Sequence, residues 1–181
     1  MSTATAPARS SERTGVITFK GNPLTLIGPE VRVGSQAPDF VVIAQDLSPV
    51  TWSDTKGKIR VVSAVPSIDT PVCDQQTRRF NQEAASLPGN VEVWTISMDL
   101  PFAQKRWCGA AGIDKIKVLS DSRDAGFGTA WGTLIKELRL VTRAVFVVDA
   151  QNVVRHAEYV KEVTTHPNYD AALAALRQIA R

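Results

Sequence analysis

Cysteine and histidine are scarce in this chain, which has two of each among 181 residues. A small secreted disulfide scaffold would hold many more cysteines, and a structural zinc site would need four closely spaced ligands. The two histidines, His156 and His166, lie far along the chain from Cys73 and Cys108. The sequence therefore favours neither a disulfide scaffold nor a metal site, and we expect no metal and no cofactor.

Long apolar runs and a strong net charge are also missing. No run approaches the ~18 residues of a membrane-spanning helix, and the N-terminus lacks the apolar centre of a secretory signal. The 21 basic and 18 acidic residues leave a net charge of only +3. No basic stripe interleaved with aromatic residues is present, so nucleic-acid binding is not indicated. We predict a soluble, cytoplasmic protein with no nucleic-acid and no membrane partner.

Length and composition fit one domain. The chain is 44% hydrophobic and 22% charged, which is enough to bury a substantial core. Its first residues are rich in Ser, Thr, Ala and Arg and offer little to bury, so we predict a disordered tail over 1–14 and a single domain over 15–181. A short organelle-targeting segment is the alternative interpretation of the tail.

Apolar β-branched runs alternate with amphipathic stretches through this domain. We expect an N-terminal hairpin over 16–26, with Gly21 in its turn. Further strands are predicted at 39–44, 50–52, 59–65, 91–98, 116–120, 144–149 and 153–160, and helices at 74–87, 101–108, 123–131 and 167–179. This order is typical of an α/β domain with a thioredoxin-like fold, in which helices flank a central mixed β-sheet.

The segment from Pro66 to Cys73 joins an expected strand to an expected helix. Free backbone N–H groups and the positive end of a helix dipole converge at such a turn, and both favour a thiolate over a thiol. Cys73 is therefore a candidate nucleophile. Asp69 and Asp74 oppose a thiolate by their charge, so we expect both carboxylates to point to solvent, where screening is strong.

Cys108 is the second thiol, late in a helix that Gly109 and Gly112 are expected to weaken. The two cysteines are either a reversible redox pair or two buried thiols that act as small hydrophobes. Composition alone gives no preference between these interpretations.

Four ordered sequence blocks resemble one protein family. The pattern Pro66-x-x-x-Thr70-x-x-Cys73 matches the active-site pattern of the peroxiredoxins. The other blocks are Phe19-Lys20-Gly21-Asn22-Pro23, Asp99-Leu100-Pro101-Phe102-Ala103-Gln104 and Thr142-Arg143-Ala144-Val145. Together they are similar to the bacterial thiol peroxidases, which are atypical two-cysteine peroxiredoxins. The resemblance runs from about Val16 to the C-terminus.

The resemblance implies roles for five residues. Cys73 would be the peroxidatic nucleophile, and Cys108 would resolve its sulfenic acid as an intramolecular disulfide. Thr70 and Arg143 would bind the thiolate and the peroxide, while Pro66 would shield the sulfur from water. Each of the last three also has a structural interpretation, as a helix cap, a surface charge and a strand end respectively.

The chemistry explains why donors are needed around the sulfur. A free cysteine is only a few per cent thiolate at neutral pH, so complete ionisation raises the reactive fraction by roughly thirty-fold. One preorganised donor aimed at the departing oxygen contributes on the order of 10²- to 10³-fold. Donors are therefore the larger effect.

The resemblance further implies the substrates and partners. These would be hydrogen peroxide and organic hydroperoxides, including those of fatty acids, with thioredoxin as the reductant and a homodimer as the assembly. A disulfide needs Cα atoms within ~7 Å, so we expect local unwinding around both cysteines between the redox states. Two other classes stay open, namely a redox sensor or chaperone-like binding module, and a structural domain with inert thiols.

Overall fold

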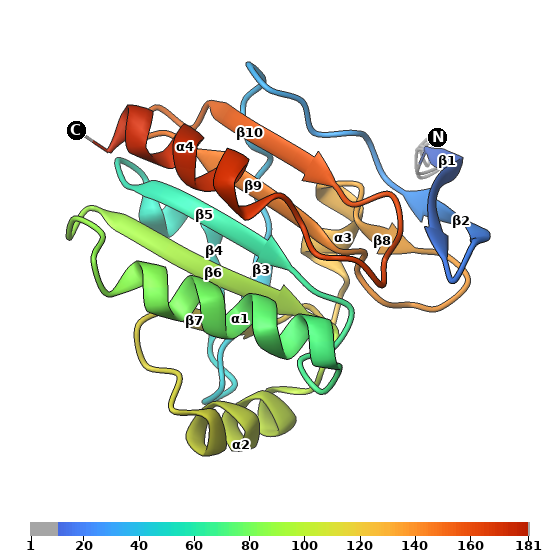
Figure 1. Ribbon diagram of the computed structural model, residues 1–181, viewed down its shortest axis with the longest axis horizontal. Coiled ribbons are helices and arrows are strands. Elements are labelled where there is room, and N and C mark those ends of the chain that lie inside the picture. Colours follow the sequence, from blue (N-terminus) through green and yellow to red (C-terminus); the bar gives the residue numbers. More distant parts are fainter. Residues whose placement is uncertain (1–10, 181) are drawn as a thin grey trace, which may run out of the picture.

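The computed structural model describes residues 11–180, and its centre is a seven-stranded sheet with the strand order β10-β9-β5-β6-β7-β3-β4 (Figure 1). The strands are β3 (Val41–Ile43), β4 (Pro49–Thr51), β5 (Ile59–Ala64), β6 (Val91–Ser97), β7 (Lys117–Ser120), β9 (Ala144–Val148) and β10 (Val154–Tyr159). The three strands β5, β6 and β7 are parallel, whereas β9 and β3 join them antiparallel. The expected α/β fold with a central mixed sheet is confirmed.

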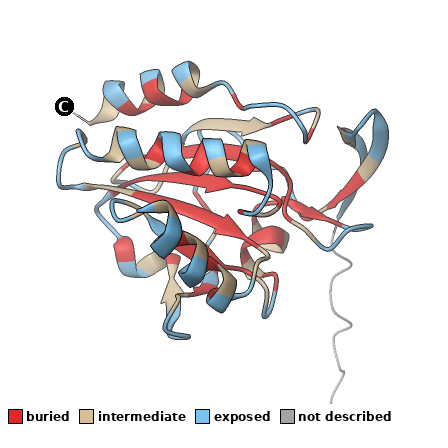
Figure 2. Ribbon diagram, turned by 60° about the horizontal axis from the view of Figure 1, so that its bottom comes forward, coloured by how far each residue is buried: buried red, intermediate tan, exposed pale blue. Residues whose placement is uncertain are grey.

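Helices cover both faces of this sheet. They are α1 (Pro71–Ala84), α2 (Pro101–Ala111), α3 (Gly126–Ala130) and α4 (Tyr169–Ile179), with a short 3-10 turn η1 (Trp52–Thr55). Alternate residues of β5 face opposite sides, because successive side chains of a strand do. Val61 packs with Phe80 of α1 and Leu173 of α4, while Val62 packs into an aromatic core on the other side. Figure 2 shows the buried strands beneath helices whose outer faces are exposed.

A second, three-stranded sheet consists of β1 (Glu12–Phe19), β2 (Asn22–Ile27) and β8 (Leu134–Ile135). The N-terminal hairpin is therefore present, but β1 begins at Glu12, so the predicted tail boundary at residue 14 is wrong. Residues 1–10 of that tail lie outside the described residues. No sequence pattern indicates β8, because two residues are too few to show a periodicity.

Element ends differ from the prediction where proline or a cap decides them. The helix α1 begins at Pro71, which suits a first helical position, so Cys73 lies inside its first turn. The helix α4 begins after Asn168, whose side chain accepts from the N–H of Ala171, rather than at Pro167. The helix expected at 123–131 is only the short α3.

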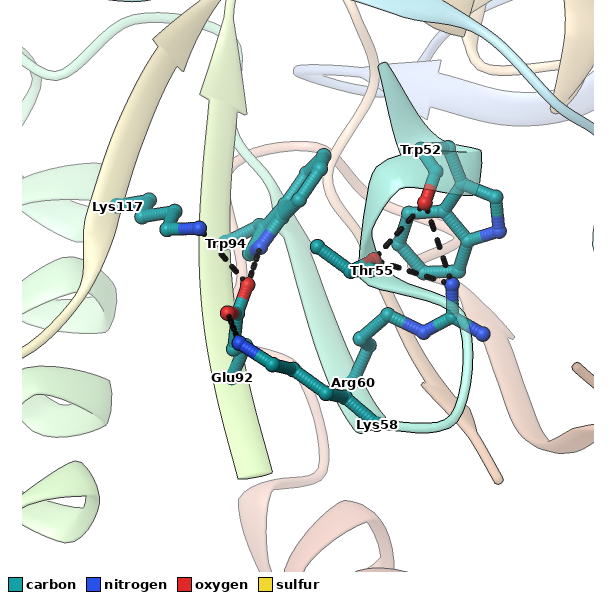
Figure 3. A network of polar contacts seen from close by, with 7 residues as sticks. All are labelled: Trp52, Thr55, Lys58, Arg60, Glu92, Trp94 and Lys117. Carbon is teal, nitrogen blue, oxygen red and sulfur yellow. Dashed lines mark hydrogen bonds and ion pairs between the residues drawn. The ribbon is translucent and has the colours of Figure 1, made fainter. Parts of the chain in front are cut away.

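A network of polar contacts holds the beginnings of β5 and β6, at the far end of β5 from Pro66 (Figure 3). Burial by itself would raise the pKa of Glu92, but donors from Lys58, Trp94 and Lys117 lower it to about 2. Arg60 is only 1% exposed and lies 3.9 Å from the centre of the Trp52 ring. No helix of the described residues is long and apolar enough to cross a membrane.

Candidate active site

The sulfur of Cys73 lies in the first turn of α1, directly after the loop that leaves β5. This residue is fully buried. Thr70, at the N-cap position, has an extended backbone, and its carbonyl accepts the first helical N–H, from Asp74, at 2.9 Å. The helix dipole at this end favours negative charge, as the sequence predicts for a thiolate.

Arg143 lies immediately before β9 and contacts the sulfur directly. Its Nη2 donates to Cys73 Sγ at 3.4 Å, and its Nε donates to the carbonyl of Val163 at 2.9 Å. The residue is 2% exposed. The interpretation of Arg143 as a surface charge is therefore wrong, and a buried cation faces the candidate nucleophile.

Gln76 binds the remaining nitrogen, Nη1, of this guanidinium. Its Oε1 accepts from Arg143 Nη1 at 2.9 Å, and its Nε2 donates to Ser63 Oγ of β5 at 2.7 Å. Sequence reasoning missed Gln76. The available signal was its spacing, because a residue three positions after Cys73 lies on the same face of a helix.

Thr70 and Pro66 line a cavity beside Arg143, and neither forms a hydrogen bond with the sulfur. The Thr70 hydroxyl donates to the carbonyl of Ser67 at 3.0 Å. It forms no capping hydrogen bond to the helix, so the interpretation of Thr70 as a side-chain cap is wrong. Pro66 is buried in the loop that follows β5. Of the predicted site residues, the structure thus brings Arg143 onto Cys73 and leaves the Thr70 hydroxyl engaged elsewhere.

Asp99 fixes the loop that carries these two residues. Its carboxylate accepts from the Ser67 hydroxyl at 2.7 Å, the N–H of Ile68 at 2.9 Å and the Ser97 hydroxyl at 2.6 Å. Such a set of donors determines where the loop runs. The family resemblance includes the sequence block that contains Asp99 but implies no role for this residue.

The two carboxylates nearest Cys73 in sequence face away from it. Asp69 is exposed, and Asp74 is half-buried and forms an ion pair with Arg78 at 2.8 Å. No described contact joins either one to the sulfur. Their cost to a thiolate is therefore reduced by solvent and by the Arg78 charge.

A cavity of about 370 Å³ opens beside Arg143. Its lining comes from the α1 entry, the hairpin turn and the loop after β10, namely Phe19, Lys20, Pro66, Thr70, Pro71, Val72, Arg143, Val163 and Thr164. Most of this lining is apolar. The sequence could not show this cavity, because its walls are far apart along the chain.

Cys108 lies in the last turn of α2 and is 8% exposed. Burial raises the pKa of its thiol, and a hydrogen bond from Gln45 Nε2 to Sγ at 3.3 Å partly opposes this. Gln45 was not singled out by the sequence. The α2 helix ends at Gly112, whose left-handed backbone directs its N–H to the Cys108 carbonyl, which also accepts from Ile113.

Both thiols are free and belong to one apolar cluster with Val65, Ile68 and Val118. The clustering shows that Cys73 and Cys108 lie in the same region of the fold, each on its own helix. Within residues 11–180, no three histidine, cysteine, aspartate or glutamate side chains lie close enough to hold a metal ion.

The comparison with known proteins agrees with this geometry. The Redoxin family model matches residues 32–173, and the chain is 62% identical to a thiol peroxidase of Halalkalibacterium halodurans over 161 residues. The chain belongs to the Redoxin family. The match to the Halalkalibacterium halodurans protein covers 89% of this chain and 96% of that relative. A thiol peroxidase of Bacillus subtilis is 58% identical over 165 residues, covering 91% and 98%.

A solved structure shares the Redoxin fold closely. The peroxiredoxin-like protein from Aquifex aeolicus superposes with a TM-score of 0.84 at 38% identity, covering 95% of this chain and 98% of that one. The resemblance predicted from the four sequence blocks is confirmed. The protein is a peroxiredoxin-type oxidoreductase with a thiol-dependent peroxidase function.

Proposed function

We propose that Cys73 is the peroxidatic cysteine and that it reduces hydrogen peroxide and organic hydroperoxides. The observation that carries this proposal is the 3.4 Å contact from the buried Arg143 guanidinium to the sulfur, next to an apolar cavity. A fixed cation stabilises a thiolate and does not lose its own proton.

In the first step the Cys73 thiolate attacks one oxygen of the O–O bond. The S–O bond forms, the O–O bond breaks, and the departing alkoxide or hydroxide takes a proton to become an alcohol or water. Cys73 is left as a sulfenic acid. Arg143 stabilises the developing negative charge, and Pro66 keeps bulk water from the sulfur.

Thr70 takes part after a small rearrangement. Its hydroxyl donates to the carbonyl of Ser67 in the reduced state. Rotation toward the cavity, which Thr70 lines, would let the hydroxyl donate to the peroxide. The role that the resemblance implies for Thr70 therefore requires the Ser67 bond to break when substrate binds.

Cys108 resolves the sulfenic acid in the second step. Its sulfur attacks Cys73 Sγ, the S–S bond forms and water leaves. The resulting disulfide requires Cα atoms within ~7 Å. We infer that the end of α2 unwinds, which breaks the bonds from Gly112 and Ile113 to the Cys108 carbonyl. A dithiol reductant of the thioredoxin type then reduces this disulfide to the two free thiols and is itself oxidised to a disulfide.

The test follows the thiols directly. Reduced protein is mixed with peroxide and quenched with an alkylating reagent, and the mass of the intact protein is measured by mass spectrometry. We expect a gain of one oxygen on Cys73 in Cys108→Ser, an internal disulfide in the wild type, and no reaction in Cys73→Ser. An unchanged mass in the wild type would show inert thiols and overturn the proposal.

Turnover separates an enzyme from a redox sensor. With thioredoxin and its reductase, we expect continuous peroxide consumption that stops in Cys73→Ser. Oxidation without turnover would favour the sensor. Unwinding has its own test, because hydrogen exchange around both cysteines should differ between the reduced and disulfide forms.

The homodimer and the cytoplasmic location are further parts of this proposal. They rest on the resemblance of the sequence to the bacterial thiol peroxidases. Light scattering after size-exclusion chromatography tests the dimer, and a protein that elutes as a monomer at all concentrations would contradict it.

A further inference from the structure

One wall of the cavity beside Arg143 comes from a different sheet. Phe19 and Lys20 belong to the end of the β1–β2 hairpin, whereas the other walls belong to α1 and to the loop after β10. The hairpin pairs with β8 in the small sheet and not with the large sheet. The position of this wall therefore depends on whatever fastens the hairpin turn to the body of the molecule.

Two backbone hydrogen bonds join Thr18 to the loop after β10, from the Thr18 N–H to the Lys161 carbonyl at 2.6 Å and from the Val163 N–H to the Thr18 carbonyl at 2.9 Å. The side chain of Glu162 extends this fastening to the turn itself. Its Oε2 accepts from the Thr18 hydroxyl at 2.7 Å and from the N–H of Gly21 at 3.1 Å. Its Oε1 accepts from the N–H of Lys20 at 2.9 Å and from the Thr164 hydroxyl at 2.8 Å. One carboxylate thus joins both sides of the hairpin turn to a second wall of the same cavity.

The turn has the backbone shape that this contact needs. Lys20 and Gly21 both have positive φ angles, of 50° and 80°, as in the tight turns that favour hairpins. Two successive N–H groups then point at one anion. A left-handed backbone is unfavourable for lysine, and the carboxylate offsets this cost.

Only neutral donors hold this charge. Within the described residues, Glu162 forms no ion pair with a lysine or arginine. Hydrogen bonds from Thr18, Gly21 and Thr164 hold the pKa of Glu162 well below its usual range. The carboxylate is therefore ionised throughout the neutral range, and the contact is constant rather than switched by pH.

We propose that Glu162 is a positioning residue that fixes the hairpin wall of the cavity and so determines how well bulky hydroperoxides reach Cys73. The inference rests on the proposed reaction at Cys73. A large substrate must pack against Phe19 and Lys20, whereas hydrogen peroxide needs only the sulfur and its donors. Arg143 is held by Gln76 and by the Val163 carbonyl, and the Val163 N–H bonds to the Thr18 carbonyl without the Glu162 side chain. Arg143 therefore keeps its place when the turn moves, and the small substrate keeps most of its rate.

The decisive variant is Glu162→Gln, because an amide offers one acceptor and turns its NH₂ group toward the turn's donors. We expect the second-order rate constant for Cys73 oxidation by cumene hydroperoxide to fall on the order of ten-fold, since small misplacements of substrate cost this much or more. The constant for hydrogen peroxide should change by no more than about two-fold. The ratio of the two constants is the readout, because general destabilisation would lower both.

Glu137→Gln is the matched control. The Glu137 carboxylate also accepts an N–H of the hairpin, from Thr25, at 3.0 and 3.1 Å, but neither residue lines the cavity. We expect its rate ratio to equal that of the wild type. If Glu162→Gln fails to fold, Thr18→Val removes one donor and should shift the ratio in the same direction by less.

An unchanged ratio in these variants, or an equal fall for both peroxides, would overturn the inference. Failure of the proposed function gives a different result, because wild-type Cys73 would then react with neither peroxide.

Discussion

Cys73 and Cys108 are both buried, and both contact the same apolar cluster, yet their helices present them in opposite ways. Cys73 lies in the first turn of α1, where free N–H groups favour an anion, whereas Cys108 lies in the last turn of α2, among carbonyl groups. The donor to Cys73 is the charged Arg143, at 3.4 Å, and the donor to Cys108 is the neutral amide of Gln45, at 3.3 Å.

This difference shows that burial alone does not decide what a thiol does. Burial raises the pKa of Cys108, which favours its thiol form. In the proposed cycle Cys108 has to ionise only when it attacks the Cys73 sulfenic acid, so it needs no thiolate when the peroxide arrives. The helix end and the charge of the donor are the features that separate the two sulfurs.

Removing the charged donor should abolish the contrast and give the largest effect. In Arg143→Met, we expect the rate constant for Cys73 oxidation by hydrogen peroxide to fall on the order of 10²- to 10³-fold, as when one preorganised donor is lost. This rate constant is measured by alkylation of samples quenched at successive times, followed by mass spectrometry.

Arg60→Met is the matched control for that experiment. Arg60 is as buried as Arg143 and lies at the other end of the large sheet, where it stacks on Trp52 (Figure 3). Arg60 also donates to Asn152 at 2.9 Å. We expect its rate constant to equal that of the wild type. Similar losses in both variants would mean that Arg143 acts through stability and not on the sulfur.

Titration of the second thiol sharpens the comparison. In Cys73→Ser only Cys108 reacts, and its alkylation rate follows the thiolate fraction. Because burial raises its pKa, the thiolate fraction at any given pH is smaller than in an unfolded chain, so the rising part of the rate profile lies at higher pH. The same variant in denaturant is the reference. Coinciding midpoints in the two profiles would contradict the expectation.

Removing the neutral donor should give the smallest effect. In Gln45→Leu, we expect the pKa of Cys108 to rise further and disulfide formation from the Cys73 sulfenic acid to slow by about three-fold, as for one ordinary hydrogen bond. The first oxidation step should keep its rate. Gln151→Leu, at an exposed position, is the control, and a faster disulfide step in Gln45→Leu would show that the amide restrains Cys108 instead of assisting it.

Local sequence signals were enough to predict the frame of the molecule. The β-branched runs gave the strands of the large sheet, and Pro71 with the strand-to-helix turn placed Cys73 at a helix start. The four sequence blocks identified the family. These features depend on neighbours along the chain, which a single sequence contains.

The rest depends on residues that only the fold brings together. Gln76, Gln45 and Glu162 have hydrogen-bond partners far away in sequence, and those partners cannot be identified from the neighbouring residues. Only the helical spacing of Gln76 from Cys73 indicated where its side chain lies. The same holds for β8, which is a strand only because β2 lies beside it. The Thr70 hydroxyl was placed on the sulfur by resemblance, whereas in this state it bonds to Ser67.

Trp107 packs against the cluster that contains both cysteines, while Trp52, Trp94 and Trp131 lie together in the aromatic core on the other side of the fold. Trp107 is therefore an intrinsic optical reporter for the proposed redox cycle. With the three distant indoles replaced by phenylalanine, emission from the remaining one would follow the opening of α2 in real time, without a dye or a label.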